Sequence, residues 1–251
     1  MGYLETLLQK YDVSEQQVKS LQWVREQLEG VLTGSWKTGD PRFYYGGSYA
    51  KNTMVNLSFD LDLVVYFPPT DMFTVKVLYE SVERRLVEKS YKLSRHNVAL
   101  RLPYDGGFYV DVVVGRAMDS TYRYANLYAS ERDTTKQTSI KTHIDLVRRN
   151  GGYQEVVRLL KIWKMRHNLN VGSFLLELAT ARALQNNRGD LENRFVTVLE
   201  FLRDRLTTAR LEDPANSSNV ITDDISSAAK SAIQQQAARS CAANTWQQVV
   251  W

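Results

Sequence analysis

The sequence feature that most constrains this chain is a pair of aspartates in an otherwise apolar segment, Asp60 and Asp62 in FDLDLVVYF. The apolar residues around them predict a buried β-strand over residues 60–67. Side chains along a strand alternate between its two faces, so the two carboxylates point the same way, about 7 Å apart. Two carboxylates on one face of a buried strand indicate a divalent-cation site.

A third carboxylate, Asp111 in FYVDVVVG, is the only charged residue of another expected strand. Burying an unpaired carboxylate costs several kcal/mol, so each of the three needs a partner or a cation. Carboxylates converging from neighbouring strands suit Mg²⁺ or Mn²⁺ better than zinc. Two such ions about 4 Å apart would activate an attacking hydroxyl and stabilise the leaving oxygen of a phosphoryl transfer. The alternative is a network of ion pairs with Arg or Lys at the strand ends.

A glycine turn, Gly46-Gly47-Ser48, precedes the aspartate pair. Because Gly46 and Gly47 have no side chains, the backbone can approach a phosphate closely and offer its amide hydrogens. Ser48 is expected to begin a short helix, whose N-terminus favours an anion. Taken alone, the same three residues could be only a tight turn; their position before the aspartate pair favours a phosphate site.

The pattern along the rest of the chain predicts a mixed α/β half followed by a helical half. Ser14 and Gln17 can form a capping box at the start of a long helix. Residues 117–142 are polar with scattered tyrosines, which indicates an irregular connection. Strands are expected over 43–46, 60–67, 97–103 and 108–114, with a hairpin turn at 104–107; helices are expected over 3–32 in two pieces, 71–89, 143–149, 154–167, 173–184, 193–210 and 224–251.

Composition narrows the class of protein without naming the function. The 251 residues are 43% hydrophobic, which is enough for a folded core, and the net charge of +4 is compatible with many kinds of partner. The single cysteine, Cys241, excludes an intrachain disulfide, and the three histidines form no zinc-ligand pattern. No apolar run approaches the roughly 18 residues of a membrane span. We therefore expect a cytoplasmic protein with no membrane partner.

Three motifs together resemble the DNA polymerase β-like nucleotidyltransferase superfamily: GGSYAKNT, FDLDLVVYF and YVDVVVG. The resemblance implies an α+β fold in which residues 1–120 form a nucleotidyltransferase core with a mixed sheet and an N-terminal helix. Residues 121–251 would form a helical nucleotide-binding lobe, with the active site in the cleft. By the same resemblance, Gly47 and Ser48 bind a triphosphate. Asp60, Asp62 and Asp111 hold two Mg²⁺ or Mn²⁺ ions, and Asp111 also lies near the attacking hydroxyl.

The second half resembles one branch of that superfamily, the oligoadenylate synthase and cyclic GMP-AMP synthase-like enzymes, which include bacterial cyclic oligonucleotide synthases of antiviral, anti-phage signalling. The segments concerned are VVRLLKIWK (156–164), SFLLELAT (173–180) and LEDPANSSNV (211–220). The resemblance implies that Lys161 and Ser173 contact the triphosphate and that Phe174 stacks on a base. Alternatively, Lys161 could lie on a solvated helix face and Phe174 in the core. The three tyrosines of the polar connection could stack on a base or pack between the two halves: Tyr122, Tyr124 and Tyr128.

The function implied by the resemblance is a metal-dependent nucleotidyltransferase. It would join nucleoside triphosphates, ATP being the favoured one, into a linear or cyclic oligonucleotide messenger and release pyrophosphate. An activating protein or ligand would be a further partner. The alternative activity is template-independent addition of nucleotides to an RNA or tRNA 3′ end, with RNA as the acceptor. A rival of another class is a catalytically silent nucleotide or RNA sensor, which the three carboxylates argue against.

Overall fold

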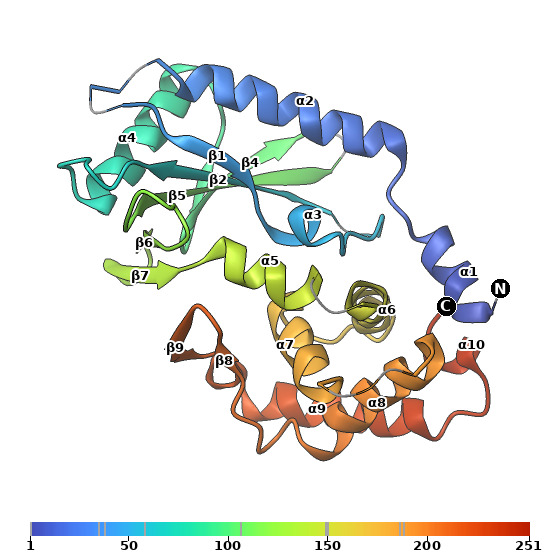
Figure 1. Cartoon of the computed structure of the whole chain (residues 1–251). Coiled ribbons are helices and arrows are strands. Elements are labelled where there is room, and N and C mark those ends of the chain that lie inside the picture. Colours follow the sequence, from blue (N-terminus) through green and yellow to red (C-terminus); the bar gives the residue numbers. More distant parts are fainter. Residues whose placement is uncertain are drawn as a thin grey trace. The chain divides into compact units, whose positions relative to one another are not determined.

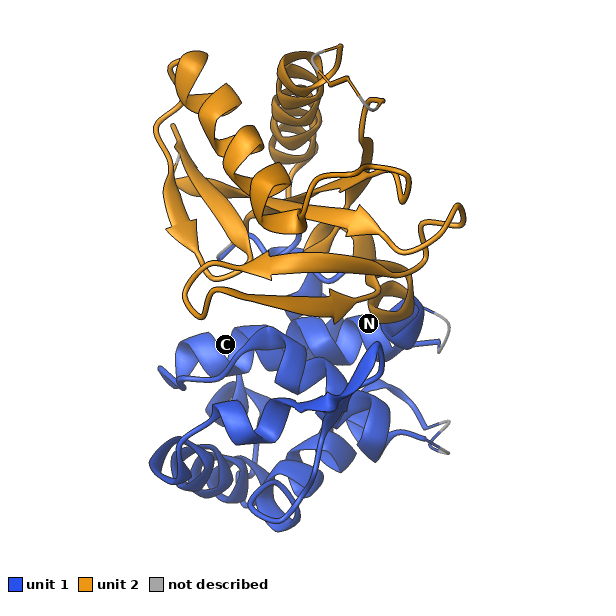
Figure 2. Cartoon of the chain, turned by 90° about the vertical axis from the view of Figure 1, so that its left-hand side faces the viewer, with its two compact units in different colours: residues 1–12, 52–57, 145–251 blue, residues 13–51, 58–144 orange. Residues whose placement is uncertain are grey.

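The computed structural model describes residues 2–34, 36–37, 39–57, 59–105, 107–148, 151–185, 187 and 189–251. The chain forms two compact units (Figure 2). The sheet unit comprises Val13–Lys51 and Ser58–Ile144, and the helical unit comprises Met1–Asp12, Asn52–Leu57 and Asp145–Trp251. Both units are therefore assembled from segments that are discontinuous in sequence. The division into functional domains at residue 120 stays a prediction.

The described part of the sheet unit contains a seven-stranded mixed sheet (Figure 1). The spatial order is β1, β2, β5, β4, β3, and β6 and β7 continue from β5. Strands β2 and β5 are parallel, and the other neighbouring pairs are antiparallel. The expected mixed sheet is thus confirmed. The strands are β1 Arg42–Tyr45, β2 Leu61–Phe67, β3 Ser94–His96, β4 Ala99–Tyr104, β5 Phe108–Ala117, β6 Ala125–Ala129 and β7 Thr134–Thr138.

Alternation along β2 separates a purely apolar face from the face that carries Asp62. The apolar face is fully buried and consists of Leu61, Leu63, Val65 and Phe67. Helices α2 (Glu15–Leu32) and α4 (Val75–Glu88) lie together on one side of the sheet (Figure 1). Val64 and Tyr66 share the face of Asp62 and pack against buried residues of β6. The sheet therefore buries one face of β2 completely, and on the other face only Asp62, near the start of the strand, is partly exposed.

Helix α2 begins where the sequence predicted it. The amide of Gln17 donates to Ser14 Oγ at 3.2 Å, and the amide of Ser14 donates to Gln17 Oε1 at 2.8 Å. These two bonds form the expected capping box and satisfy two of the amide groups that a helix start leaves without helical partners.

The expected irregular connection over residues 117–142 is wrong. Strands β6 and β7 lie there, and helix α5 (Ile140–Arg148) begins before the connection was expected to end. Strand β7, TTKQT, lies at the edge of the sheet and contains only polar residues, so it lacks the apolar alternation by which strands are recognised. The helix expected over 193–210 ends at Asp204, and a short hairpin, β8 Glu212–Asp213 and β9 Asn216–Val220, follows it. A one-turn 3-10 helix spans Ile221–Asp224.

The helical unit packs around α6 (Tyr153–Arg166). Trp163 of α6 is fully buried, and its indole N–H donates to Ser240 Oγ at 2.9 Å, so the most bulky core residue is also hydrogen-bonded. The predicted helical character of this part of the chain is confirmed apart from the β8–β9 hairpin. Where the chain is described, none of its helices has the length and apolar character needed to cross a membrane. The other helices are α1 Tyr3–Lys10, α7 Ser173–Ala183, α8 Leu191–Asp204, α9 Ser227–Cys241 and α10 Trp246–Val249.

Candidate active site

The glycine turn and the first carboxylates form one local structure. The turn connects β1 to the short helix α3 (Gly47–Lys51), and the Gly46 amide donates to the Asp62 carbonyl oxygen at 2.8 Å. Gly47 has φ +49°, and a Cβ atom there would lie only 1.5 Å from Asp62 Oδ2. A side chain at this position would therefore collide with the carboxylate. Glycine suits this position for two reasons: the backbone is left-handed, and a side chain would leave no room for the Asp62 carboxylate. Ser48 follows in α3 and is half-buried.

The parallel pairing of β2 and β5 brings two of the predicted carboxylates side by side. Asp62 and Asp111 are direct partners in the register, so their side chains leave the sheet on the same face. Asp60 lies immediately before β2 and, like Asp62, is partly exposed. Asp111 is 8% exposed, as expected for a carboxylate within a central strand. The sheet unit thus places all three predicted acids at the same end of β2 and its neighbour.

Arg101 was not predicted as a site residue. It lies in β4, on the edge of β5 opposite to β2, and it is the direct partner of Asp111 there. Arg101 and Asp111 face each other in the antiparallel register of β4 and β5. Arg101 Nε donates to Asp111 Oδ1 at 2.8 Å, and Nη2 donates to Oδ2 at 2.7 Å. This bidentate pair with Asp111, together with the negative charge of Asp60, raises the pKa of the Arg101 guanidinium. The ion-pair alternative considered for the acidic residues is therefore realised at Asp111.

Asp60, Asp62 and Asp111 supply donor atoms that suit a hard divalent cation, although in the described residues they are not gathered into an ion site. Carboxylate oxygens are the ligands that Mg²⁺ and Mn²⁺ prefer. In the described residues, however, no three or more His, Cys, Asp or Glu side chains are gathered closely enough to hold one ion. Both oxygens of Asp111 accept hydrogen bonds from Arg101. An ion bound to Asp111 would therefore lie beside the positive charge of Arg101, which disfavours its binding.

The predicted triphosphate ligands Lys161 and Ser173 belong to the helical unit, where two lysines of α6 contact different partners. Lys161 is 7% exposed, so the alternative of a solvated lysine is wrong. Its Nζ donates to the Thr53 carbonyl oxygen at 2.9 Å and to Thr53 Oγ1 at 3.2 Å. Ser173, the first residue of α7, accepts a 3.2 Å hydrogen bond from Lys164 Nζ. Phe174 is partly buried against the helical core. The roles of these residues toward a nucleotide stay predictions.

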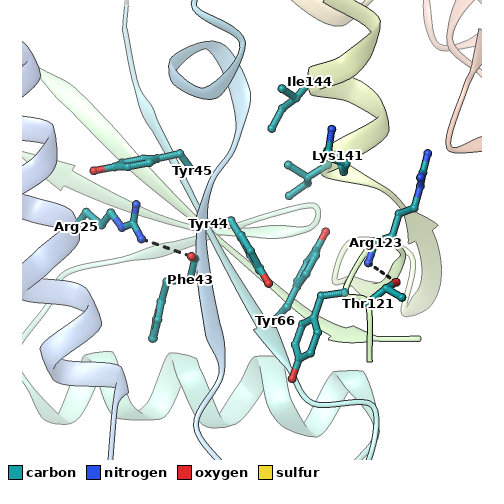
Figure 3. A pocket seen from close by; sticks show the side chains of 11 residues that line it. Arg25, Phe43, Tyr44, Tyr45, Tyr66, Thr121, Arg123, Lys141 and Ile144 are labelled. Atoms are coloured by element: carbon teal, nitrogen blue, oxygen red, sulfur yellow. Dashed lines mark hydrogen bonds between the residues drawn. The ribbon is translucent and has the colours of Figure 1, made fainter. Parts of the chain in front are cut away.

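A cavity of about 650 Å³ in the sheet unit was not foreseen from the sequence. Tyr44 of β1 and Tyr66 of β2 project into it beside Lys141 and Ile144 (Figure 3). The ring centroids of Tyr44 and Tyr66 are 5.8 Å apart, and burial raises the pKa of the Tyr66 hydroxyl. Tyr122, one of the three tyrosines considered for base stacking, also lines this cavity. The full lining is Arg25, Phe43, Tyr44, Tyr45, Tyr66, Thr121, Tyr122, Arg123, Ile140, Lys141 and Ile144.

No protein-family model matches the chain. A curated relative, cyclic AMP-AMP-AMP synthase of Escherichia coli (strain MS 115-1), is 27% identical over 194 residues, which cover 70% of this chain and 60% of the relative. The chain therefore matches less than two thirds of that relative's length.

Solved structures resemble the chain over almost its whole length. CdnC of E. coli MS115-1 in its complex with HORMA-deltaN matches with a TM-score of 0.76 and 19% identity, covering 95% of this chain and 92% of that one. The CdnC structure with ATP matches with a TM-score of 0.73 and 21% identity, covering 98% and 92%. The Cid1 poly(U) polymerase matches with a TM-score of 0.72 and 12% identity, covering 97% and 94%. At these identities the likeness concerns the fold, and the α+β fold expected from the motifs is confirmed.

Proposed function

We propose, from the nucleotidyltransferase fold that the chain shares with these proteins, that it joins nucleoside triphosphates into a linear or cyclic oligonucleotide messenger and releases pyrophosphate. The observation that carries the proposal is the contact of the Gly46-Gly47 turn with Asp62, which is itself aligned with Asp111. A backbone turn that can cradle phosphate is thereby joined to carboxylates that suit divalent ions. The sequence likeness to a cyclic AMP-AMP-AMP synthase supports ATP as a substrate.

In the proposed reaction, Asp60, Asp62 and Asp111 would hold two Mg²⁺ or Mn²⁺ ions. When bound, these ions neutralise charge on the triphosphate and make the attacking hydroxyl more acidic. The Gly47 backbone and the Ser48 hydroxyl would orient the phosphates, and Asp111 would accept a hydrogen bond from the hydroxyl of the acceptor nucleotide. The hydroxyl proton passes to Asp111 as a bond forms between that hydroxyl oxygen and the α-phosphorus. The bond from the α-phosphorus to the bridging oxygen of the β-phosphate breaks, and pyrophosphate leaves.

The helical unit would supply the remaining contacts with the nucleotide. Lys161 is an ammonium held by Thr53, within the segment that follows the glycine turn in sequence. This attachment supports a role for Lys161 as a pre-positioned cation for the triphosphate. Lys164 donates to Ser173 Oγ, which would orient the Ser173 hydroxyl, and the partly buried ring of Phe174 would stack on the base.

Two features of the relatives extend the proposal. CdnC was solved in a complex with HORMA-deltaN, and we propose that a protein partner activates this chain as well, in a cytoplasmic antiviral pathway. The likeness to the Cid1 poly(U) polymerase supports a second candidate activity, template-independent addition of nucleotides to an RNA end. Both candidates use the same carboxylates and differ only in the acceptor.

The test is incubation with labelled nucleoside triphosphates and Mg²⁺ or Mn²⁺, with and without tRNA. The proposal expects small phosphatase-resistant products that form without RNA. Asp62→Asn should abolish them, whereas the matched variant Asp105→Asn, which alters an exposed aspartate of the sheet unit, should not. Label that enters only the added RNA would favour the RNA-end activity. Turnover that Asp62→Asn leaves unchanged would refute the proposed site.

A further inference from the structure

We infer that Arg101 is an internal competitor of the divalent cation, holding Asp111 until an ion displaces it. This inference rests on the proposed function, because it assigns a role to Arg101 in the same carboxylate site. Arg101 would be a positioning residue that acts through Asp111 and sets the affinity for the metal.

The competition follows from the position of the guanidinium charge on the Asp111 carboxylate. The guanidinium of Arg101 engages Oδ1 and Oδ2 of Asp111 at once, at 2.8 and 2.7 Å. A cation coordinated by Asp111 would share an oxygen with Arg101, since each carboxylate oxygen keeps one lone pair beside the hydrogen bond it accepts. A guanidinium left beside the ion would also repel it. The intact bidentate pair therefore opposes binding of an ion at Asp111, because the guanidinium and the ion repel each other across one carboxylate.

The hairpin of β4 and β5 makes this pair a built-in feature of the sheet. Tyr104 pairs with Phe108 at the end of the hairpin, and counting back along both strands places Arg101 opposite Asp111. Directly opposed residues of opposite charge stabilise an antiparallel pair. The backbone hydrogen-bond ladder thus holds the two side chains within reach whenever the hairpin is formed.

The surroundings of Arg101 allow it to move away without unfolding the sheet. Its side chain is 31% exposed, whereas that of Asp111 is 12% exposed. The guanidinium carbon lies 5.1 Å from the ring centroid of Tyr109, which is itself 46% exposed. A guanidinium released from Asp111 can therefore stay in contact with the Tyr109 face and with water. Asp111 is the fixed partner and Arg101 the displaceable one.

The pair also explains how a buried carboxylate is tolerated without an ion. A carboxylate in a central strand is costly unless it is paired, and removing its partner leaves that cost uncompensated. Arg101 satisfies Asp111 in the absence of metal, and the ion satisfies it when bound. The free energy of the lost ion pair is subtracted from that of metal binding, so the affinity of the protein for metal is lower than the carboxylates alone would give.

The experiment measures Mn²⁺ binding to the whole protein, by the electron paramagnetic resonance signal of free Mn²⁺ and by calorimetry, without nucleotide. Arg101→Gln should bind Mn²⁺ about tenfold more tightly than the unmodified protein, because one neighbouring positive charge is gone. Arg101→Lys keeps the charge without the bidentate fork, so it should fall between the two. Asp111→Asn combined with Arg101→Gln should remove the gain.

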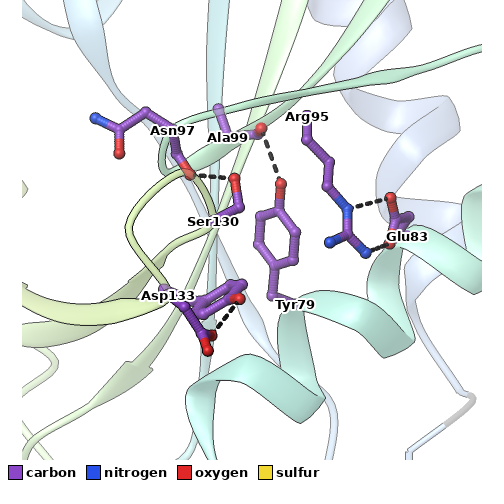
Figure 4. Close-up of polar contacts among 8 residues, drawn as sticks. Tyr79, Glu83, Arg95, Asn97, Ala99, Ser130 and Asp133 are labelled. Carbon is purple, nitrogen blue, oxygen red and sulfur yellow. Dashed lines mark hydrogen bonds and ion pairs between the residues drawn. The ribbon is translucent and has the colours of Figure 1, made fainter.

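Arg95→Gln is the matched control. Arg95 makes a comparable bidentate pair with Glu83 in the same unit (Figure 4), away from the three predicted acids in sequence. Its Mn²⁺ affinity should stay within about twofold of that of the unmodified protein, since the charge removed does not face Asp111. A second measurement is the rise in melting temperature on adding Mn²⁺. This rise should be larger for Arg101→Gln than for the unmodified protein, because Asp111 has lost its partner. For Arg95→Gln the rise should equal that of the unmodified protein.

Unchanged or weaker Mn²⁺ binding by folded Arg101→Gln would overturn the inference, because it would mean that Arg101 only stabilises the sheet. If Asp62→Asn still abolishes product formation in that case, the proposed function survives and only the competition is refuted. Failure of both the unmodified protein and Arg101→Gln to bind Mn²⁺ would overturn the inference together with the metal-dependent function. Arg101→Lys provides the same comparison should Arg101→Gln fail to fold.

Discussion

Gly47→Ala is the substitution for which the structure makes the sharpest prediction. Two separate costs can be worked out. At φ +49° an alanine adopts a left-handed conformation that costs roughly 1–2 kcal/mol relative to its normal one. The added Cβ would also lie 1.5 Å from Asp62 Oδ2, which is far inside van der Waals contact, so either the carboxylate rotates or the turn moves.

Gly34→Ala separates these two costs. Gly34 has φ +73°, but among the described residues, its chain neighbours aside, no atom lies within 4 Å of the position that its Cβ would take. It therefore carries the backbone cost alone, for which we expect a fall in melting temperature of about 2–8 °C for a chain of this size, at about 2–4 °C per kcal/mol. Gly47→Ala should lower the melting temperature further.

The catalytic consequence distinguishes the two glycines more clearly. Displacing Asp62 by about 1 Å should reduce kcat/KM for oligonucleotide formation by about 100-fold, since misplacement of that size disrupts the reacting geometry. Gly34→Ala should retain activity. The assays are thermal unfolding and initial rates of pyrophosphate release. Activity of Gly47→Ala within threefold of the unmodified protein, with no more loss of stability than in Gly34→Ala, would refute the close contact between the turn and Asp62.

Three further predictions follow from buried or partly buried groups. Lys161→Met should cost about 1–3 kcal/mol of stability, because the Thr53 carbonyl loses its charged donor, and it should raise the KM for ATP. Urea unfolding and steady-state kinetics measure the two effects. An unchanged midpoint of urea unfolding would contradict the first. The stability of the protein should fall as pH rises above about 10, because burial raises the pKa of Tyr66 and the unfolded chain then ionises first. Tyr66→Phe should flatten that alkaline decline, as followed by urea titration at several pH values, and an equally steep decline would argue against it. Burial also raises the pKa of the Cys241 thiol, so a smaller fraction is thiolate at pH 8. Iodoacetamide should therefore modify Cys241 more slowly than it modifies a cysteine peptide. Equal rates would contradict the burial of this thiol.

Local patterns were sufficient to predict several parts of the fold and the candidate site. The capping box at Ser14 and Gln17 depends on residues three apart, and the structure contains it. The hairpin turn at 104–107 was likewise predicted, although Gly106 lies outside the described residues. That hairpin already implied the partner of Asp111, because its register places Arg101 opposite the carboxylate. The signal for Arg101 was present in the sequence and would have required counting the residues of the hairpin.

Other elements were missed because their signal does not lie in their own residues. Strand β7 is polar and only partly buried, and it pairs with β6, which supplies its hydrogen-bond partners. Lys161 was as compatible with a solvated helix face as with a buried one. Its burial depends on Thr53, which is 108 residues away in the chain. Propensity and periodicity operate over a few residues, and contacts of this length cannot be read from them.

The sequence by itself determined the chemistry available to this protein: Asp60 and Asp62 two residues apart, a glycine turn before them, and a third acid in another apolar strand. Tertiary structure alone decided how these groups meet. The parallel pairing of β2 with β5 aligns Asp62 with Asp111, and the turn closes onto the Asp62 carboxylate. Parallel strands need a long crossover between them, so their register depends on the packing of the intervening elements and not on any local pattern.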